Sequence, residues 1–204
     1  MNDKRKKPEI SWFGALCDDD YEFLGVVAPE LTSSWNHCRD IVLCAEENGF
    51  DNILLPSGYE LGIDATSFAS AISVATNKIR LLLAVRMGEM WLPQLARQMA
   101  TIDQMSGGRL TINIISSELP GQKLESDPRY ERTREYMKVL RQLLNGNPVD
   151  FHGQFVDLEI EAPRVRTVSG HCPLFYFGGF SEAAKETAAM EADVFLTWPD
   201  TVKG

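Results

Sequence analysis

The chain has 204 residues, 44% of them hydrophobic, and this length suits one domain that can bury a core. A formal net charge of −9 gives an acidic surface, which repels phosphate backbones and argues against nucleic-acid binding. No apolar run approaches the roughly 18 residues that cross a bilayer, and no signal-peptide core follows the basic residues Lys4 to Lys7. We expect a cytoplasmic protein that binds no membrane and carries a solvated basic tail at residues 1–9.

The cysteines and histidines do not follow the spacing of a metal site. Cys17, Cys38, Cys44 and Cys172 fit no zinc motif, and a reducing cytosol disfavours disulfides. The three histidines are widely scattered along the chain. We therefore expect no structural metal.

Short apolar runs alternate with amphipathic stretches in the first half of the chain. The sequence predicts strands at Ile10 to Leu16, Ile53 to Leu55 and Ile79 to Val85, with helices from Trp35 to the Asn48-Gly49 stop and from Ala65 to Ala75. Ser33 or Ser34 is suited to cap the first of these helices.

The alternation continues in the second half, with one interruption. The sequence predicts helices from Pro93 to Gly107-Gly108, through Tyr136 to a stop near Gly146, and from Ser181 to Met190, and strands at Leu110 to Ile115, Leu174 to Phe177 and Val194 to Leu196. The interruption is Val149 to Ile160, which reads as two strands around His152-Gly153. This segment is expected to be an inserted β-hairpin.

Apolar strands that alternate with amphipathic helices indicate an α/β fold with a parallel sheet covered by helices on both sides. Two architectures fit this pattern. A doubly wound open sheet would have about this length, whereas a (β/α)₈ barrel needs roughly 250 residues and two more strand–helix units. The periodicity alone favours the open sheet.

Polar residues at the carboxyl ends of the strands are candidates for a binding site, because ligands of parallel α/β folds bind there. Ser57 and Gly58 follow the second strand and offer a hydroxyl and a peptide N–H, although they also suit an ordinary turn. Arg86 ends the third strand, where it could bind an anion or form a surface ion pair.

Two further strands carry candidate groups. Asn113 interrupts an apolar run, and its amide could bond a heteroaromatic ring, an oxyanion or the neighbouring backbone. Gly178-Gly179 precede a helix that begins at Ser181, so backbone N–H groups there could bind an anion such as a phosphate group, or Ser181 could act only as an N-cap. The chain has neither the G-x-G-x-x-G nor the P-loop motif, so a dinucleotide Rossmann site and a P-loop are not supported.

Several segments in a fixed order together carry a family resemblance. They are Gly49-Phe50-Asp51 with Leu54-Leu55-Pro56-Ser57-Gly58, Leu83 to Arg86, Ala96 to Arg109 ending in S-G-G-R, Asn113 to Ser117, Asp127 to Arg132, Phe175 to Ser181, and Phe195 to Trp198. Their order and spacing resemble the bacterial luciferase-like flavin monooxygenase superfamily, and within it the FMNH₂-dependent alkanesulfonate monooxygenases.

The resemblance implies a fold and an activity. The fold would be a (β/α)₈ TIM barrel, here a single domain over residues 1–204 that stops after about six strands. The activity would use O₂ and reduced FMN, supplied by a flavin reductase, to convert an alkanesulfonate into an aldehyde and sulfite. Members of the family are usually dimers, so a homo-oligomer is expected.

The resemblance also implies roles for single residues. Ser57, Gly58 and Asn113 would line the isoalloxazine ring, Ser116, Ser117 and Tyr130 would contact the flavin or its ribityl chain, and Arg129 and Ser181 would lie near the phosphate. Asn113, Trp198 and Arg86 would act at the catalytic centre, with Trp198 as a wall of the substrate cavity and Arg86 on the substrate side.

Two departures from the family pattern leave alternatives open. The loop from Tyr59 to Asp64 has no cysteine where sulfonate enzymes often carry one, so dimethyl sulfone, another organosulfur compound or a non-sulfur substrate also fits. The family's last two strands, with His, Arg and Tyr side chains of the site, have no counterpart before Gly204. The alternatives are a non-catalytic flavin-binding protein with an incomplete barrel and a remnant that binds nothing; a deazaflavin cofactor is less favoured than FMN.

Overall fold

A computed structural model of the chain describes residues 8–18, 26, 28, 30, 33–59 and 62–197. The basic residues 4–7 and Trp198, predicted to wall the substrate cavity, lie outside these residues.

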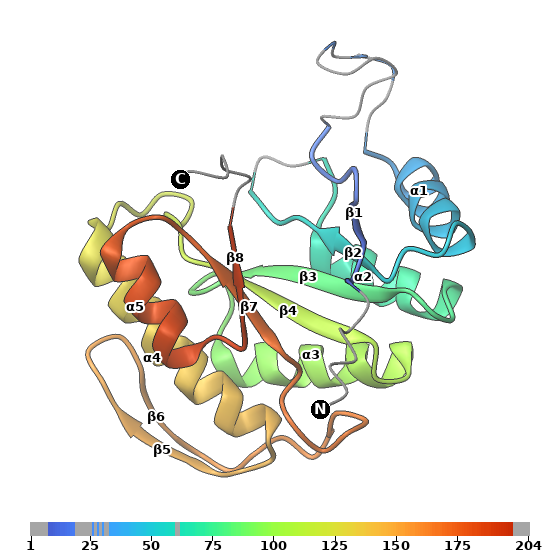
Figure 1. Cartoon of the computed structure of the whole chain (residues 1–204). Helices are drawn as coiled ribbons and strands as arrows, with labels where there is room; N and C mark the ends of the chain where they lie inside the picture. The colour runs from blue at the N-terminus through green and yellow to red at the C-terminus, as the bar shows by residue number, and fades with distance from the viewer. Residues whose placement is uncertain are drawn as a thin grey trace, which may run out of the picture.

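Six strands form one parallel sheet, and their spatial order follows the chain (Figure 1). They are β1 (Ser11–Phe13), β2 (Asn52–Leu55), β3 (Arg80–Arg86), β4 (Leu110–Ile115), β7 (Phe175–Gly178) and β8 (Val194–Leu196). In a doubly wound sheet this order would reverse at a switch point, and here it does not. The sheet is therefore a partial barrel, as the family resemblance predicted, and the open sheet favoured by periodicity alone is wrong.

In the described part of the chain, five helices connect these strands: α1 (Trp35–Glu47), α2 (Ala65–Ala75), α3 (Leu92–Ser106), α4 (Ser126–Leu144) and α5 (Glu182–Glu191). Right-handed crossovers between consecutive neighbouring strands place all their helices on the same face of the sheet. The expectation that helices cover both faces is therefore wrong, because continuous apolar strands do not reveal strand order. Ser34 caps α1, and Gly107 closes α3 with a left-handed backbone, as the sequence predicted.

Side chains alternate between the helix-covered face and the concave face of the sheet. Leu83 and Ile112 are fully buried and belong to the core between sheet and helices. Their sequence neighbours Ala84 and Asn113 are paired in register on the concave face, and Asn113 is also paired with Tyr176 of β7. Asn113 is thus directed towards the interior of the partial barrel.

The predicted hairpin is confirmed. Strands β5 (Val149–His152) and β6 (Asp157–Ile160) are antiparallel and form a separate two-stranded sheet. The Glu135 carboxylate on α4 accepts hydrogen bonds from the backbone N–H groups of residues 154–156 at 2.8 to 2.9 Å. The hairpin is therefore held against the outer helix layer, away from the strand ends that carry the candidate site.

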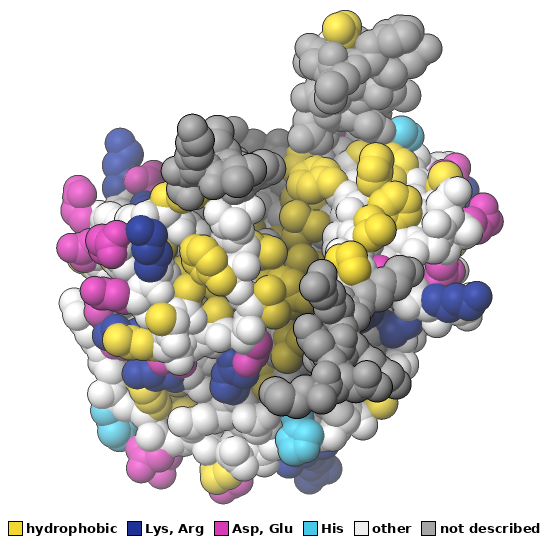
Figure 2. Space-filling view, in the orientation of Figure 1, with side chains coloured by type: hydrophobic (Ala, Val, Ile, Leu, Met, Phe, Trp, Pro, Cys, Tyr) yellow, Lys and Arg dark blue, Asp and Glu magenta, His cyan; other side chains and the backbone are white. Residues whose placement is uncertain are grey.

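The concave face is open between the two edge strands, β1 and β8. Phe13 of β1, in register with Leu54 on this face, is 45% exposed; Phe195 of β8, 48% exposed, is in register with Phe177 and lies on the helix-covered face at the other edge. Figure 2 shows hydrophobic side chains gathered in a hollow between the side of the molecule that carries α5 and the side that carries α1. Among the described residues, no helix is both long enough and apolar enough to cross a membrane.

Candidate functional site

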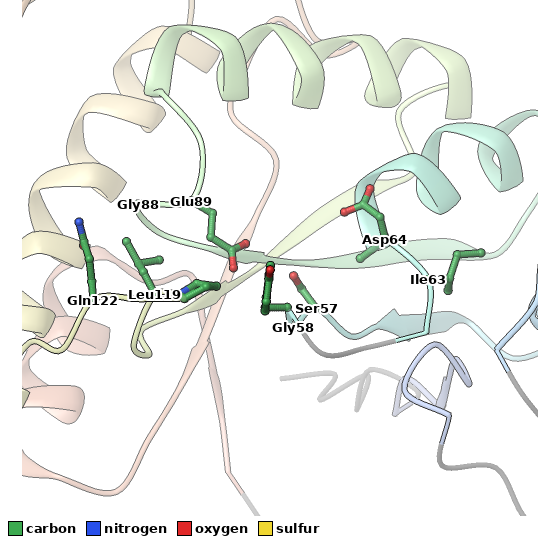
Figure 3. Close-up of a pocket in the computed structure, with 11 residues that line it drawn as sticks. Ser57, Gly58, Ile63, Asp64, Gly88, Glu89, Leu119 and Gln122 are labelled. Carbon is green, nitrogen blue, oxygen red and sulfur yellow. The ribbon is translucent and has the colours of Figure 1, made fainter. Parts of the chain in front are cut away.

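A cavity of about 500 Å³ lies where β2, β3 and β4 end. The loops after these strands and the start of α2 form its wall: Ser57, Gly58, Tyr59, Ile63, Asp64, Ala65, Gly88, Glu89, Leu119, Pro120 and Gln122. In Figure 3 the Glu89 carboxylate points towards Ser57, and Asp64 and Gln122 lie on opposite sides of the cavity. Ser57 and Gly58, two predicted site residues, thus belong to a real cavity at the carboxyl edge of the sheet.

Arg86 joins the three loops that form this cavity. Its Nη1 donates to Glu118 O at 3.0 Å, its Nη2 lies 3.4 Å from Ser57 O, and its Nε lies 3.5 Å from Glu89 Oε1. The guanidinium therefore binds groups of the protein that follow β2, β3 and β4. These contacts fit a residue that positions the loops better than one that waits for a substrate anion.

The loop after β4 is bonded to the first turns of α4. Thr133 Oγ1 lies 2.9 Å from both Ser116 Oγ and Arg129 O. Arg132 Nη2 donates to Ser117 O at 3.2 Å. The predicted residues Ser116, Ser117 and Arg129 are therefore close together, and Arg132, which sequence reasoning missed, helps to hold them.

Unpaired polar atoms are concentrated in the same region. Within the described chain, the buried side-chain atoms without a hydrogen-bond partner include Ser117 Oγ and the Nε atoms of Arg129 and Arg132. Arg132 is only 6% exposed. Burial lowers its pKa, Tyr136 opposes this shift, and the positive charge of Arg129 adds to it. Because unpaired buried donors are costly, this region favours an anionic or oxygen-rich ligand.

A second polar region lies at the start of α5. Ser181 Oγ accepts a hydrogen bond from the Ala184 N–H at 3.2 Å, so the residue does act as an N-cap. A methyl group at Gly179 would lie 2.6 Å from Ala184 Cβ and 3.4 Å from Tyr130 Oη. Tyr130 and Ser181 therefore lie at the same helix N-terminus. Only glycine at position 179 leaves space there for the Tyr130 hydroxyl to lie close to the backbone.

The predicted site residues form three groups and not one. Ser57 and Gly58 line the cavity, Asn113 faces the interior of the partial barrel, and the remaining serines, Arg129 and Tyr130 lie around α4 and α5. Sequence reasoning missed Asp64, Glu89 and Gln122 of the cavity. The sequence held a signal for two of them. Asp64 has the position of an N-cap before a helix, and Glu89 is three residues from Arg86.

No group of three or more His, Cys, Asp or Glu residues in the described part of the chain could hold a metal ion. The described cysteines Cys17, Cys38, Cys44 and Cys172 form no disulfide.

A profile of the luciferase-like monooxygenase family matches residues 23–203. The chain belongs to this family, which confirms the superfamily predicted from the ordered motifs. Among curated proteins, it is 58% identical over 201 residues to a sulfoquinovose monooxygenase of Novosphingobium aromaticivorans, covering 95% of this chain and 56% of that protein. It is 46% identical over 196 residues to a sulfoquinovose monooxygenase of Agrobacterium fabrum, covering 95% of this chain and 51% of that protein. The chain spans about half the length of these relatives.

Solved structures share the fold at low sequence identity. An EDTA monooxygenase from a Chelativorans species has a TM-score of 0.76 at 18% identity, and the match covers 92% of this chain and 55% of that one. A long-chain alkane monooxygenase has a TM-score of 0.75 at 18% identity, with 90% of this chain and 54% of that one covered. These likenesses support the luciferase-like barrel architecture.

Proposed function

We propose that this chain contains the flavin-binding part of a reduced-FMN-dependent monooxygenase that removes sulfite from an organosulfur compound. The observation that carries the proposal is the concentration of unpaired buried donors around Ser117 and Arg129, together with the α5 N-terminus beside Tyr130. Both features suit the phosphate and the polar ribityl chain of FMN. Membership of the luciferase-like family supports the same cofactor.

The three groups of residues are proposed to bind different parts of FMN. The phosphate would be bound by Ser181, Tyr130, Arg129 and the backbone at Gly179. Ser116 and Ser117 would contact the ribityl chain. Ser57, Gly58 and Asn113 would line the ring, because the first two lie at the end of β2 and Asn113 faces the barrel interior.

When bound, reduced FMN would supply, together with O₂, an oxygen atom to the substrate carbon. This oxygen takes the place of the sulfite group, and the product is an aldehyde. The protein's own contribution is to bind and orient this group and to exclude water from it. Arg86 would keep the ring-lining loop in place through Ser57 O. Trp198 remains a proposed wall of the substrate cavity.

A flavin reductase would supply the reduced cofactor, and the exposed edges of the sheet support self-association.

The substrate that these observations favour is a sugar sulfonate rather than a simple alkanesulfonate. Both curated relatives are named for sulfoquinovose, a sugar that carries a sulfonate. The identity of 58% over nearly the whole chain supports a shared substrate class.

A chimera tests the proposal. Residues 1–204 would be joined to the remaining C-terminal part of the Novosphingobium aromaticivorans relative and assayed for sulfite release with reduced FMN, O₂ and sulfoquinovose. We expect sulfite release that depends on both the flavin and O₂. A folded chimera that binds FMN but releases no sulfite would instead support a non-catalytic flavin-binding protein.

A further inference from the structure

Among the cavity residues that have no part in the proposed flavin site, Asp64, Glu89 and Gln122 carry a carboxylate or an amide. Asp64 Oδ1 caps α2 by accepting from the Ser67 N–H at 2.7 Å, which leaves its Oδ2 for another donor. Glu89 is anchored on one side by Arg86, and its carboxylate points into the cavity towards Ser57 (Figure 3). The backbone N–H of Gln122 donates to Leu119 O at 2.9 Å, which fixes the loop that carries its side chain.

The charge of the cavity wall determines which part of a substrate can bind there. Asp64 and Glu89 are acidic, and no lysine or arginine is among the described lining residues. Arg86 offsets the charge of Glu89, but its donors are directed at Ser57 O, Glu118 O and Glu89 itself, so the wall offers a sulfonate no cation of its own, whereas hydroxyl groups donate good hydrogen bonds to the two carboxylates. The Gln122 amide can both donate and accept, and Tyr59, 76% exposed at the rim, offers an apolar ring face.

The position of the cavity connects it to the proposed chemistry. Ser57 and Gly58 belong both to its wall and to the set proposed for the flavin ring, so a ligand in the cavity would adjoin the flavin. A volume of about 500 Å³ is within the range of small-molecule pockets.

We propose that this cavity is a subsite for the uncharged, polyhydroxylated part of the substrate, bound by Asp64, Glu89 and Gln122. The sulfonate then points away from these two carboxylates. This assignment rests on the proposed function for its link to catalysis, but the recognition of hydroxyl groups follows from the cavity wall alone.

Ligand-observed NMR on the 204-residue chain tests the subsite without any flavin. The probes are glucose, sulfoquinovose and hexane-1-sulfonate, which has the same number of carbon atoms but no hydroxyl group. We expect saturation transfer to the ring protons of glucose and sulfoquinovose, and at least about fivefold weaker binding of hexane-1-sulfonate. Equal binding of all three probes, or no binding of either sugar, would overturn the proposal.

Two variants identify the groups responsible. Glu89→Gln and Asp64→Asn remove a negative charge with little change of shape, and asparagine still caps a helix. We expect each to weaken glucose binding about tenfold, through the lost charge-assisted hydrogen bonds, and not to weaken hexane-1-sulfonate binding. Asp150→Asn, an exposed carboxylate on the hairpin, is the matched control and should change neither. Unchanged sugar binding in both cavity variants, with unchanged melting temperatures, would refute the assignment.

The test separates the subsite from the proposed function. Sugar binding that depends on Glu89 would persist even if the chain bound no FMN, in which case only the flavin proposal fails. Conversely, FMN binding with no preference for hydroxylated probes would leave the flavin proposal intact and remove the subsite.

Discussion

Arg86 is the residue on which the shape of the cavity depends most. It contacts Ser57 O, Glu118 O and Glu89, each on a different loop. We predict that Arg86→Ala weakens FMN affinity about tenfold, because the loop that carries Ser57 and Gly58 loses its anchor. Arg86→Lys should recover only part of this affinity, since one ammonium cannot reach three separate partners.

Fluorescence titration with FMN measures the effect of the Arg86 variants. Arg97→Ala is the control, because Arg97 is an exposed residue of α3 that bonds Gln94 of its own helix. FMN affinity that is unchanged in Arg86→Ala would show that the loops hold their positions without the guanidinium.

Gly179 tests the phosphate end of the proposed flavin site. In Gly179→Ala, the new methyl group would lie 2.6 Å from Ala184 Cβ, so the start of α5 must move. We expect a loss of roughly 2 kcal/mol of unfolding free energy and a marked loss of FMN affinity. Urea unfolding and FMN titration measure the two effects. Ala189→Ser, at an exposed position of the same helix, should leave both unchanged.

At the residue scale, strand-end positions predicted some residues of the cavity wall and not others. Ser57 and Gly58 were predictable because they directly follow an apolar strand. Asp64 and Glu89 were not, because their place in the cavity depends on how the loops after β2 and β3 fold back. Arg86 was a candidate because it ends a strand, but its partners, two loop carbonyls and the Glu89 carboxylate, cannot be found from alternation.

At the scale of elements, a polar clamp holds the amino-terminal end of the sheet. Arg109, the last residue of the S-G-G-R motif, donates to Ser73 O, Thr76 O and Ile79 O at 2.7 to 2.9 Å. Glu46 of α1 accepts from the backbone N–H groups of residues 77–79 at 2.6 to 2.9 Å. The motif that carried much of the family resemblance is therefore structural, and it lies at the opposite end of the strands from the site.

The clamp gives stability a defined pH dependence. Burial opposes ionisation of Glu46, but the three N–H donors and Arg109 outweigh it and lower the pKa of this carboxyl. A carboxyl group whose pKa is lower in the folded than in the unfolded state stabilises the fold when the pH is above its unfolded pKa. This stabilisation is lost as the pH falls through its folded pKa. We therefore predict that Glu46→Gln destabilises the protein by about 1 kcal/mol at pH 7, because this partly exposed group is screened by solvent.

Urea unfolding at several pH values measures this difference. The difference in unfolding free energy between the wild type and Glu46→Gln should shrink as pH falls below the ordinary glutamate pKa of 4.5 and vanish below the lowered pKa of the folded state. Glu47→Gln, at the exposed last position of α1, is the control and should follow the wild type throughout. A gap that is constant over the whole pH range would contradict the role of the Glu46 charge.

The elements themselves were largely predictable from local signals. The Ser34 cap, the Gly107 stop and the hairpin of β5 and β6 follow from residue chemistry within a few positions. The first strand is shorter than predicted, Ser11–Phe13 instead of Ile10 to Leu16, because Gly14 to Leu16 leave the sheet after the Gly14 N–H bonds Leu54 O.

At the scale of the whole molecule, strand order decides between the two architectures, and hydrophobic periodicity cannot report it. Each strand pairs with the next parallel strand in the chain, so right-handed crossovers build one helix layer around a concave interior. The order of the sequence motifs resembles that of a barrel family, and this resemblance predicted the concave sheet. The flavin groups proposed here lie at the carboxyl ends of the strands or face that interior.

The residues of this chain are expected to suffice for binding a flavin. Titration of the purified 204-residue chain with FMN, followed by quenching of flavin fluorescence, tests it directly. We predict saturable binding of one FMN per chain, weakened in Gly179→Ala and Arg86→Ala and unchanged in Arg97→Ala. A folded chain that shows no quenching up to high micromolar FMN would contradict the claim.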